Sequence, residues 1–196
     1  MWFPSFVKRV RLPALMVGLL VLSGCAGLGS TPAPSLSPEV QAQMQERHQR
    51  ALAAMAQGDQ GLAQTIWQEM ISLQPSLVVP YVNLGVLAER QGDKEAAKGW
   101  YEKALIVDAT QPEALNQLGV LYREDGQFNQ ALECYQRALA ANDQLPQAHY
   151  NLGILYDLYL ADYQQAIAHY EQYQALSEDK DENVARWIID LKRRVQ

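Results

Sequence analysis

The sequence predicts an all-α protein made of repeated helix pairs. Beyond residue 38, apolar residues recur at the three- and four-residue spacing of helices, and glycine or proline interrupts them about every dozen residues. No alternating β-branched run is present. The third observation is a period, because the pairs Leu84-Gly85, Leu118-Gly119 and Leu152-Gly153 follow one another at one constant interval.

Residues 1–24 have the features of a bacterial export signal. Basic residues precede an apolar run over 12–22, which is far shorter than the roughly 20 residues that a membrane-spanning helix needs. The run ends in Leu22-Ser23-Gly24-Cys25, which resembles the signal of bacterial lipoproteins. The resemblance implies cleavage before Cys25 and attachment of lipid chains such as palmitate to it. The alternative is a plain secretory signal with a chance cysteine.

Residues 25–38 are rich in glycine, serine and proline. Such a composition neither sustains a helix nor packs into a core, so we expect a flexible tether that carries the lipidated Cys25. Because acylation would occupy Cys25, the only other cysteine, Cys134, would have no disulfide partner in this chain.

The period extends beyond the glycines. Ala97 and Ala131, and likewise Tyr101 and Tyr135, are separated by the same interval. The pattern resembles the tetratricopeptide repeat family, in which each unit of about 34 residues is a helix, a turn and a second helix. The resemblance implies a right-handed α-solenoid of about four helix pairs with a C-terminal capping helix. Glycine gives room for the neighbouring helix, and the tyrosines fill the remaining space.

The period divides the folded part into five segments. The first repeat is degenerate, because Ala51 stands where glycine is expected, and the fourth needs one extra residue in its turn at 160–163. The last helix carries an apolar stripe typical of a cap, which solenoids need to cover their final repeat. The segments are 39–77 (degenerate repeat), 78–111, 112–145, 146–180 (repeat with the turn insertion) and 181–196 (capping helix, with the stripe Val184, Trp187, Ile188, Leu191 and Val195).

Charge argues against two classes of partner. The formal net charge is −6, and removal of residues 1–24 makes it −9, because the leader holds three of the basic residues and none of the acids. An acidic chain is repelled by nucleic acid and by anionic headgroups. We therefore expect no nucleic-acid binding, and membrane attachment through the lipid anchor alone, for which two or more acyl chains suffice.

The sequence offers no catalytic constellation. His48, His149 and His169 have no histidine or cysteine at metal-ligand spacing, and Cys134 is expected to be a packing residue in the second helix of its repeat. No phosphate-binding loop or nucleophile elbow is present. We therefore expect a protein that is not an enzyme and that needs no cofactor, metal or small-molecule substrate.

The remaining candidate site is a protein-binding groove. In the family, the first helices of the repeats line the concave side, and the apolar level Leu52, Val86, Val120 and Ile154 recurs in all four repeats. An apolar centre with a polar rim is typical of protein interfaces, although these side chains could equally pack against the next helix. The full stripe comprises His48, Leu52 and Met55; Val82, Asn83, Val86 and Glu89; Asn116, Gln117, Val120 and Arg123; and Tyr150, Asn151, Ile154 and Asp157.

Together these features predict a membrane-tethered scaffold of the bacterial envelope that binds a protein or peptide partner. With Ala26 as the residue after Cys25, the sequence resembles lipoproteins that are sorted to the outer membrane. We therefore expect the protein to be anchored at the periplasmic face of that membrane. The layout resembles lipoproteins that assist a type IV or Tad-type pilus or its secretin. Alternatives are an adaptor for peptidoglycan synthases or hydrolases, a component of outer-membrane protein assembly, an enzyme with an unrecognised site, or a spacer.

Overall fold

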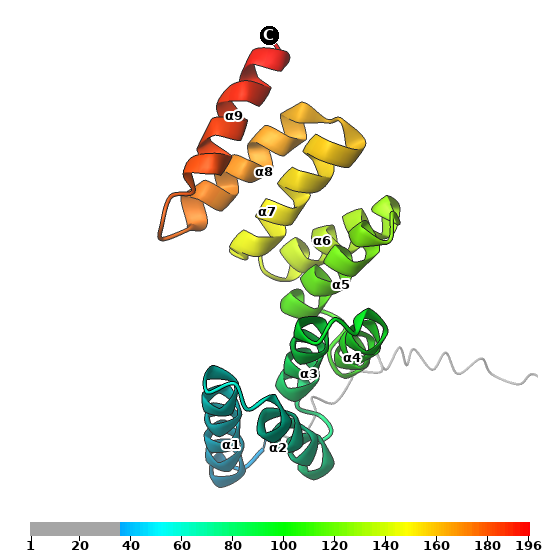
Figure 1. Ribbon diagram of the computed structural model, residues 1–196, viewed down its shortest axis with the longest axis vertical. Helices are drawn as coiled ribbons and strands as arrows, with labels where there is room; N and C mark the ends of the chain where they lie inside the picture. Colours follow the sequence, from blue (N-terminus) through cyan, green and yellow to red (C-terminus); the bar gives the residue numbers. More distant parts are fainter. Residues whose placement is uncertain (1–35) are drawn as a thin grey trace, which may run out of the picture. The chain divides into compact units, whose positions relative to one another are not determined.

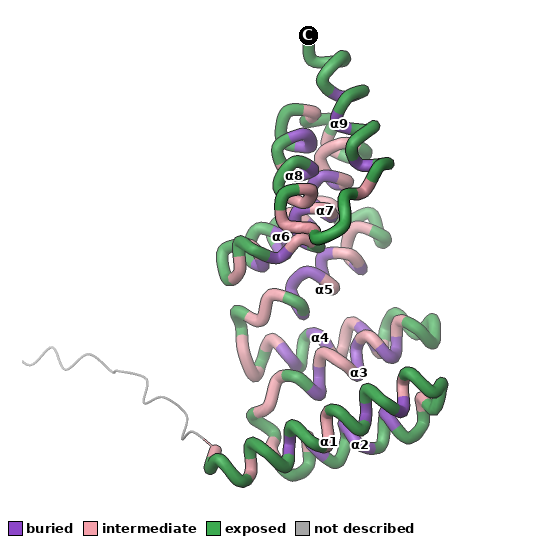
Figure 2. The backbone as a smooth tube through the Cα atoms, turned by 90° about the vertical axis from the view of Figure 1, so that its left-hand side faces the viewer, coloured by how far each residue is buried: buried purple, intermediate pink, exposed green. Residues whose placement is uncertain are grey.

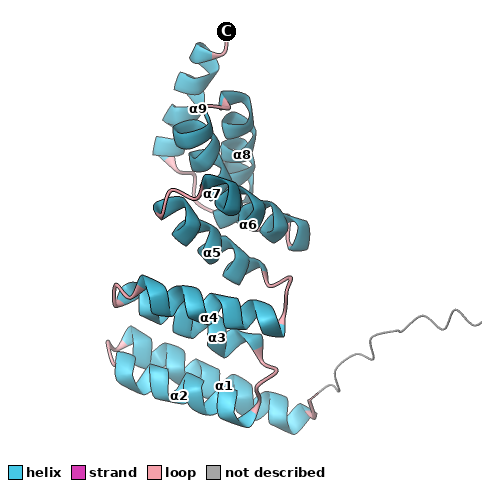
Figure 3. Ribbon diagram, turned by 90° about the vertical axis from the view of Figure 1, so that its right-hand side faces the viewer, coloured by secondary structure: helices cyan, strands magenta, loops and turns pink. Residues whose placement is uncertain are grey.

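The computed structural model describes residues 36–196, so the predicted signal peptide, Cys25 and nearly all of the tether lie outside the described residues. The described part is helical throughout (Figure 1 and Figure 3). Its helices are α1 (Pro38–Ala56), α2 (Gln60–Leu73), α3 (Val78–Arg90), α4 (Lys94–Val107), α5 (Pro112–Glu124), α6 (Phe128–Ala141), α7 (Pro146–Leu155), α8 (Tyr163–Leu176) and α9 (Glu182–Arg194), with a π-helical turn, η1 (Tyr156–Leu160), between α7 and α8. No helix among them is both long and apolar enough to cross a membrane.

The helices pack in chain order as four pairs followed by a single helix. Each odd-numbered helix from α1 to α7 packs against the helix that follows it, each pair packs on the next, and α9 packs on α8. Buried residues lie between the helices, and exposed residues lie along their outer sides (Figure 2). The predicted all-α solenoid of four helix pairs and a capping helix is confirmed.

Local signals fix the ends of the helices. The carboxylates of Asp59, Asp93 and Asp162 accept hydrogen bonds from backbone amides in the first turns of α2, α4 and α8, which satisfies donors that a helix leaves unpaired. Before two of these caps, Gly58 and Gly92 have φ of 81° and 77°, a conformation that favours glycine. The turns within the first, second and fourth pairs are therefore encoded locally.

A glycine and a tyrosine hold each of the later pairs together. A Cβ atom added to Gly119 would lie 2.6 Å from Cε1 of Tyr135, so the ring lies directly on the backbone of the first helix. The same fit joins Gly85 to Tyr101 and Gly153 to Tyr170. In the first pair the buried Trp67 takes the place of the tyrosine.

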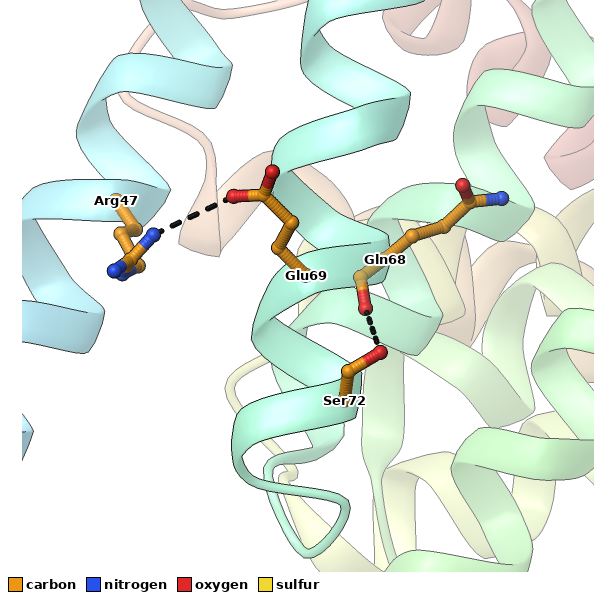
Figure 4. Close-up of polar contacts among 4 residues, drawn as sticks. All are labelled: Arg47, Gln68, Glu69 and Ser72. Carbon is orange, nitrogen blue, oxygen red and sulfur yellow. Dashed lines mark hydrogen bonds and ion pairs between the residues drawn. The ribbon is translucent and has the colours of Figure 1, made fainter.

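The first pair begins at Pro38, with Ser37 as its N-cap. The helix thus includes the last residue of the predicted tether and the start of the degenerate repeat. An exposed ion pair joins its two helices, with Nη1 of Arg47 3.4 Å from Oε2 of Glu69, and the Ser72 hydroxyl donates to the backbone oxygen of Gln68 on α2 (Figure 4). Such exposed pairs stabilise little, so the degenerate repeat depends on its buried residues.

The extra residue of the fourth repeat is accommodated in a π-helical turn. The helix widens over η1, Ala161 adopts a left-handed conformation with φ 54°, and Asp162 then caps α8. A single inserted residue is a common origin of a π-turn, because the hydrogen bonds then join residues five apart. The sequence indicated an insertion in the turn at 160–163, and the structure places the adjustment at the end of the first helix.

The capping helix covers α8 with only part of its predicted stripe. Val184, Ile188 and Leu191 are buried, and Lys192 pairs with Glu171 at 2.7 Å. Trp187 is 38 % exposed, and Val195 is exposed as well. Trp187 nevertheless packs on Tyr170 of α8, with the ring centroids 5.6 Å apart, and Val195 follows the last residue of α9. The fully buried part of the stripe is therefore narrower than the predicted stripe.

Candidate protein-binding groove

The predicted groove residues come from the first helices of the four pairs, α1, α3, α5 and α7, and from η1. Most of them are half-buried, which leaves part of each side chain open to a partner. We call this set, from His48 to Asp157, the first-helix stripe. Within its apolar level, Val86, Val120 and Ile154 are half-buried against the core clusters, and Leu52 is exposed. The level therefore contributes both to packing and to the accessible surface.

Polar side chains of the stripe form a hydrogen-bonded ladder across three pairs. Gln117 on α5 donates to Oε2 of Glu89 on α3 at 3.0 Å, and Asn116 donates to Oε1 of Gln117 at 3.0 Å. Asn151 on α7 donates to Oδ1 of Asn116 at 2.9 Å. The ladder links α3, α5 and α7 through side chains that occupy neighbouring positions of successive repeats.

Burial changes the role of two predicted groove residues, Asn116 on the stripe and Asn151 at its edge. Asn116 and Asn151 are only 4 % and 8 % exposed, and they bond to each other. Because a buried amide needs such partners, these two side chains stabilise the array and do not offer an open amide surface. Asn83 at the equivalent edge donates to the backbone oxygen of Val79 at 2.8 Å. The accessible part of the stripe therefore consists mainly of its apolar level and the charged residues beside it.

Three charged residues occupy one position of successive repeats, with alternating sign. Glu89, Arg123 and Asp157 follow one another at the interval of the repeats, and all three are half-buried. Burial raises the pKa of the Glu89 carboxyl, and the neighbouring Tyr101 and Gln117 side chains oppose the shift. Burial also raises the pKa of Asp157, which Arg194 opposes. Within residues 36–196 none of the three has an oppositely charged group within 4.0 Å.

Two clefts open beside the acidic members of this series. One has a volume of about 320 Å³ and the other of about 350 Å³. The first contains Glu89 and Val120 of the stripe, and the second contains Ile154 and Asp157. The linings are Glu89, Gly92, Lys94, Val120, Leu121 and Glu124 for the first cleft, and Ile154, Asp157, Leu158, Tyr170, Trp187 and Arg194 for the second.

The N-terminal end of the stripe has a different character. His48 accepts a hydrogen bond from Nε1 of Trp67 at 3.3 Å, and burial lowers its pKa. Its side chain also lines an apolar cavity of about 200 Å³ with Met44, Met70 and Pro80. His48 therefore supports the packing of the first pair, next to an open apolar surface.

Two histidines that the sequence does not predict to be neighbours are in contact. Nδ1 of His149 lies 3.0 Å from Nδ1 of His169, across α7 and α8, and His169 stacks on Tyr156. Burial, reinforced by His149, lowers the pKa of His169 to about 4. The two histidines lie on different helices, so helical spacing could not reveal the pair. No group of three or more His, Cys, Asp or Glu in the described part of the chain is arranged to hold a metal ion.

Cys134 is buried, as its position in the second helix of the third pair suggested. Burial raises the pKa of its thiol to about 11. The thiolate, which is the nucleophilic form, is therefore scarce at neutral pH. The residue fills space between helices.

Comparison with protein families identifies the repeats. Models described as tetratricopeptide repeat or TPR repeat match residues 80–110, 100–133, 120–157 and 148–184. Together the matches cover 80–184. The pair α1 and α2 lies before the matched region, so its assignment as a degenerate repeat depends on its helices and on the period. No curated protein sequence matches the chain.

Solved structures share the same arrangement of helices. Pseudomonas aeruginosa pilF has a TM-score of 0.68 and 20 % identity, over 79 % of this chain and 70 % of that one. MamA has a TM-score of 0.61 and 23 % identity, over 74 % and 84 % of the two chains. The first TPR domain of Spaghetti (RPAP3), bound to the HSP90 peptide SRMEEVD, has a TM-score of 0.54 and 19 % identity, over 60 % and 94 %. At these identities the likeness is one of fold.

Proposed function

Because residues 80–184 of this chain are tetratricopeptide repeats, we propose that the protein is a protein-binding scaffold held at a bacterial envelope membrane by a lipid on Cys25. The binding role is supported by the apolar level of the first-helix stripe, which is accessible in part and flanked by charged side chains. This combination is typical of interfaces for a protein segment. The HSP90 peptide bound to the Spaghetti domain is an instance of peptide binding by the same fold.

The occupant that fits this surface is a peptide or helix that offers apolar side chains to the level and polar groups to its margins. Nucleic acid does not fit, since the chain without its leader has a formal charge of −9. The membrane is reached through the acyl chains, with Ala26 favouring the outer membrane and its periplasmic face.

Within the envelope, we assign the scaffold to the assembly of a type IV or Tad-type pilus or its secretin. The support is the layout of leader, short tether and a small repeat array. The likeness to pilF is compatible with this assignment and concerns the fold. Co-purification of pilus or secretin components with the protein would support the assignment, whereas co-purification of peptidoglycan synthases or hydrolases would replace it.

Replacing Cys25 with serine is expected to remove the membrane anchor. A serine hydroxyl lacks the nucleophilicity of a thiol and receives no lipid, so the variant should stay uncleaved or be recovered in the soluble fraction. Metabolic labelling with a radioactive fatty acid, followed by fractionation of the envelope, measures both effects. The variant Cys134→Ser is the matched control, because that buried cysteine should not affect labelling. Fatty-acid labelling that persists without Cys25 would overturn the proposed anchor.

A further inference from the structure

The alternating charges of the stripe are incompletely neutralised by the protein itself. Glu89 has a hydrogen bond from Gln117, but no cation lies within 4.0 Å of it in residues 36–196. The adjacent Glu124 adds negative charge to the same cleft, although Lys94 pairs with it at 2.5 Å. A half-buried carboxylate without a cation is costly, so this cleft attracts a positive group.

Arg123 is the clearest unsatisfied group of the series. Its Nε atom is buried and has no hydrogen-bond acceptor within the described part of the chain. The neighbouring groups include the phenols of Tyr135, Tyr150 and Tyr170, and the buried hydroxyl of Tyr135 likewise has no hydrogen-bond partner within the described residues. Burial raises the pKa of Tyr135 to about 12, with Arg123 opposing the shift. A neutral phenol does not balance a guanidinium. A buried donor without an acceptor is rare in proteins. Because Arg123 is only half-buried, the rest of its guanidinium is open to an acidic group of a partner.

Asp157 occupies the same position as Glu89, two repeats further along the chain, and within residues 36–196 it is likewise half-buried without a cation within 4.0 Å. It lines the second cleft with Trp187, which is 38 % exposed and also packs on Tyr150 and Tyr170, so part of its ring is available to a cation. Arg194 also lines this cleft, but it lies over the ring of Tyr163 at 5.8 Å and is not within 4.0 Å of the Asp157 carboxylate. The cleft can therefore accept a basic side chain, with Arg194 as an internal competitor.

We propose that the first-helix stripe recognises a partner segment in which a basic, an acidic and a second basic side chain occur in that order, opposite Glu89, Arg123 and Asp157. The apolar residues between them cover the level formed by Val86, Val120 and Ile154. The inference rests on the proposed binding function and specifies its partner. Charge complementarity of this kind selects a partner and fixes its register along the surface.

A peptide panel tests the order of charges. The probes are fluorescent synthetic peptides of alanine and valine with two lysines and one glutamate, separated by two, three or four apolar residues. Each Lys-Glu-Lys peptide has a Lys-Lys-Glu control of identical composition and net charge, so the overall negative charge of the protein attracts both equally. Binding to the full chain in detergent is measured by fluorescence anisotropy. For at least one spacing, the Lys-Glu-Lys peptide is expected to bind about tenfold more tightly, the effect of one charge-assisted hydrogen bond.

Variants then locate the preference. Arg123→Glu is expected to remove it, and Arg123→Lys is expected to retain most of it because the positive charge remains. Arg137→Glu is the matched control, since Arg137 lies exposed on α6 and pairs with Glu133 of the same helix. Circular dichroism establishes that each variant is folded.

Equal affinity for both charge orders at every spacing, or no binding of any peptide, would overturn the inference, as would a preference that survives Arg123→Glu. The proposed function is judged separately by capture of the native partner, which the apolar level supports without reference to these charges. If the protein captures its partner through Val86 and Val120 but binds both charge orders equally, the proposed function stands and this inference is wrong.

Discussion

The double substitution Val86→Glu and Val120→Glu is expected to abolish capture of the partner from the native envelope. Both valines belong to the apolar level of the first-helix stripe and are half-buried. A carboxylate there would be left unpaired under a bound segment. Two such groups cost about 3 kcal/mol or more in binding, which weakens the complex by at least about a hundredfold. Quantitative co-purification after crosslinking in the cell measures the loss.

A matched control distinguishes a specific effect at the first-helix stripe from a general effect of added negative charge. Leu73 and Ile106 lie on second helices and are 53 % and 84 % exposed, so Leu73→Glu with Ile106→Glu should leave capture unchanged. Because the valines also touch the core, circular dichroism and the melting temperature must show that the glutamate variant is folded. The milder pair Val86→Thr and Val120→Thr keeps the side-chain volume and should reduce capture partially. A folded glutamate variant that retrieves the same partners as the parent would exclude the apolar level as the site.

Deletion of residues 182–196 is expected to destabilise the array by several kcal/mol. The deletion removes Val184, Ile188 and Leu191, which are buried against α8, and burial of such a side chain contributes about 2 kcal/mol. It also exposes Ile167 and Tyr170 on α8, so aggregation should accompany the loss. Thermal unfolding followed by circular dichroism, with light scattering for aggregation, measures both consequences.

A shorter deletion provides the control. Removal of residues 193–196 takes away only exposed residues and keeps the buried side chains of α9, so the melting temperature should change little. If both deletions leave the melting curve unaltered, α9 is not a cap. If both deletions lower the melting temperature equally, the exposed end of α9 contributes more to the stability of the array than its burial indicates.

The periodic part of this fold is predictable from the sequence. Glycine at 85, 119 and 153 repeats because a tyrosine ring of the second helix lies on the backbone there, and any side chain would clash. This steric requirement has the same form in each repeat, so it appears in the sequence as a fixed interval. The turns between the two helices of a pair are equally local, since a capping aspartate or a turn glycine marks them.

The contacts between repeats are less predictable. Spacing shows that Asn116 and Asn151 lie on the same face as the valines, but it does not show that they are buried and bonded to each other. The contact of His149 with His169 depends on which residues of two packed helices meet, which no period encodes. Likewise the apolar stripe of α9 predicts which side of the helix is buried but not how wide the buried face is. The partial exposure of Trp187 therefore could not be predicted from the stripe.

Site-specific photocrosslinking in living cells shows directly whether the partner contacts the first-helix stripe. A photoreactive amino acid is placed, one position at a time, at Val86, Val120 and Ile154 on the first-helix stripe. It is also placed at Ile106 on α4, the second helix of its pair. We expect the three stripe positions to crosslink to one and the same protein, and we expect no crosslink to it from Ile106. Crosslinks from Ile106 to the partner, with none from the three stripe positions in a folded protein, would contradict this expectation and move the binding surface to the second helices.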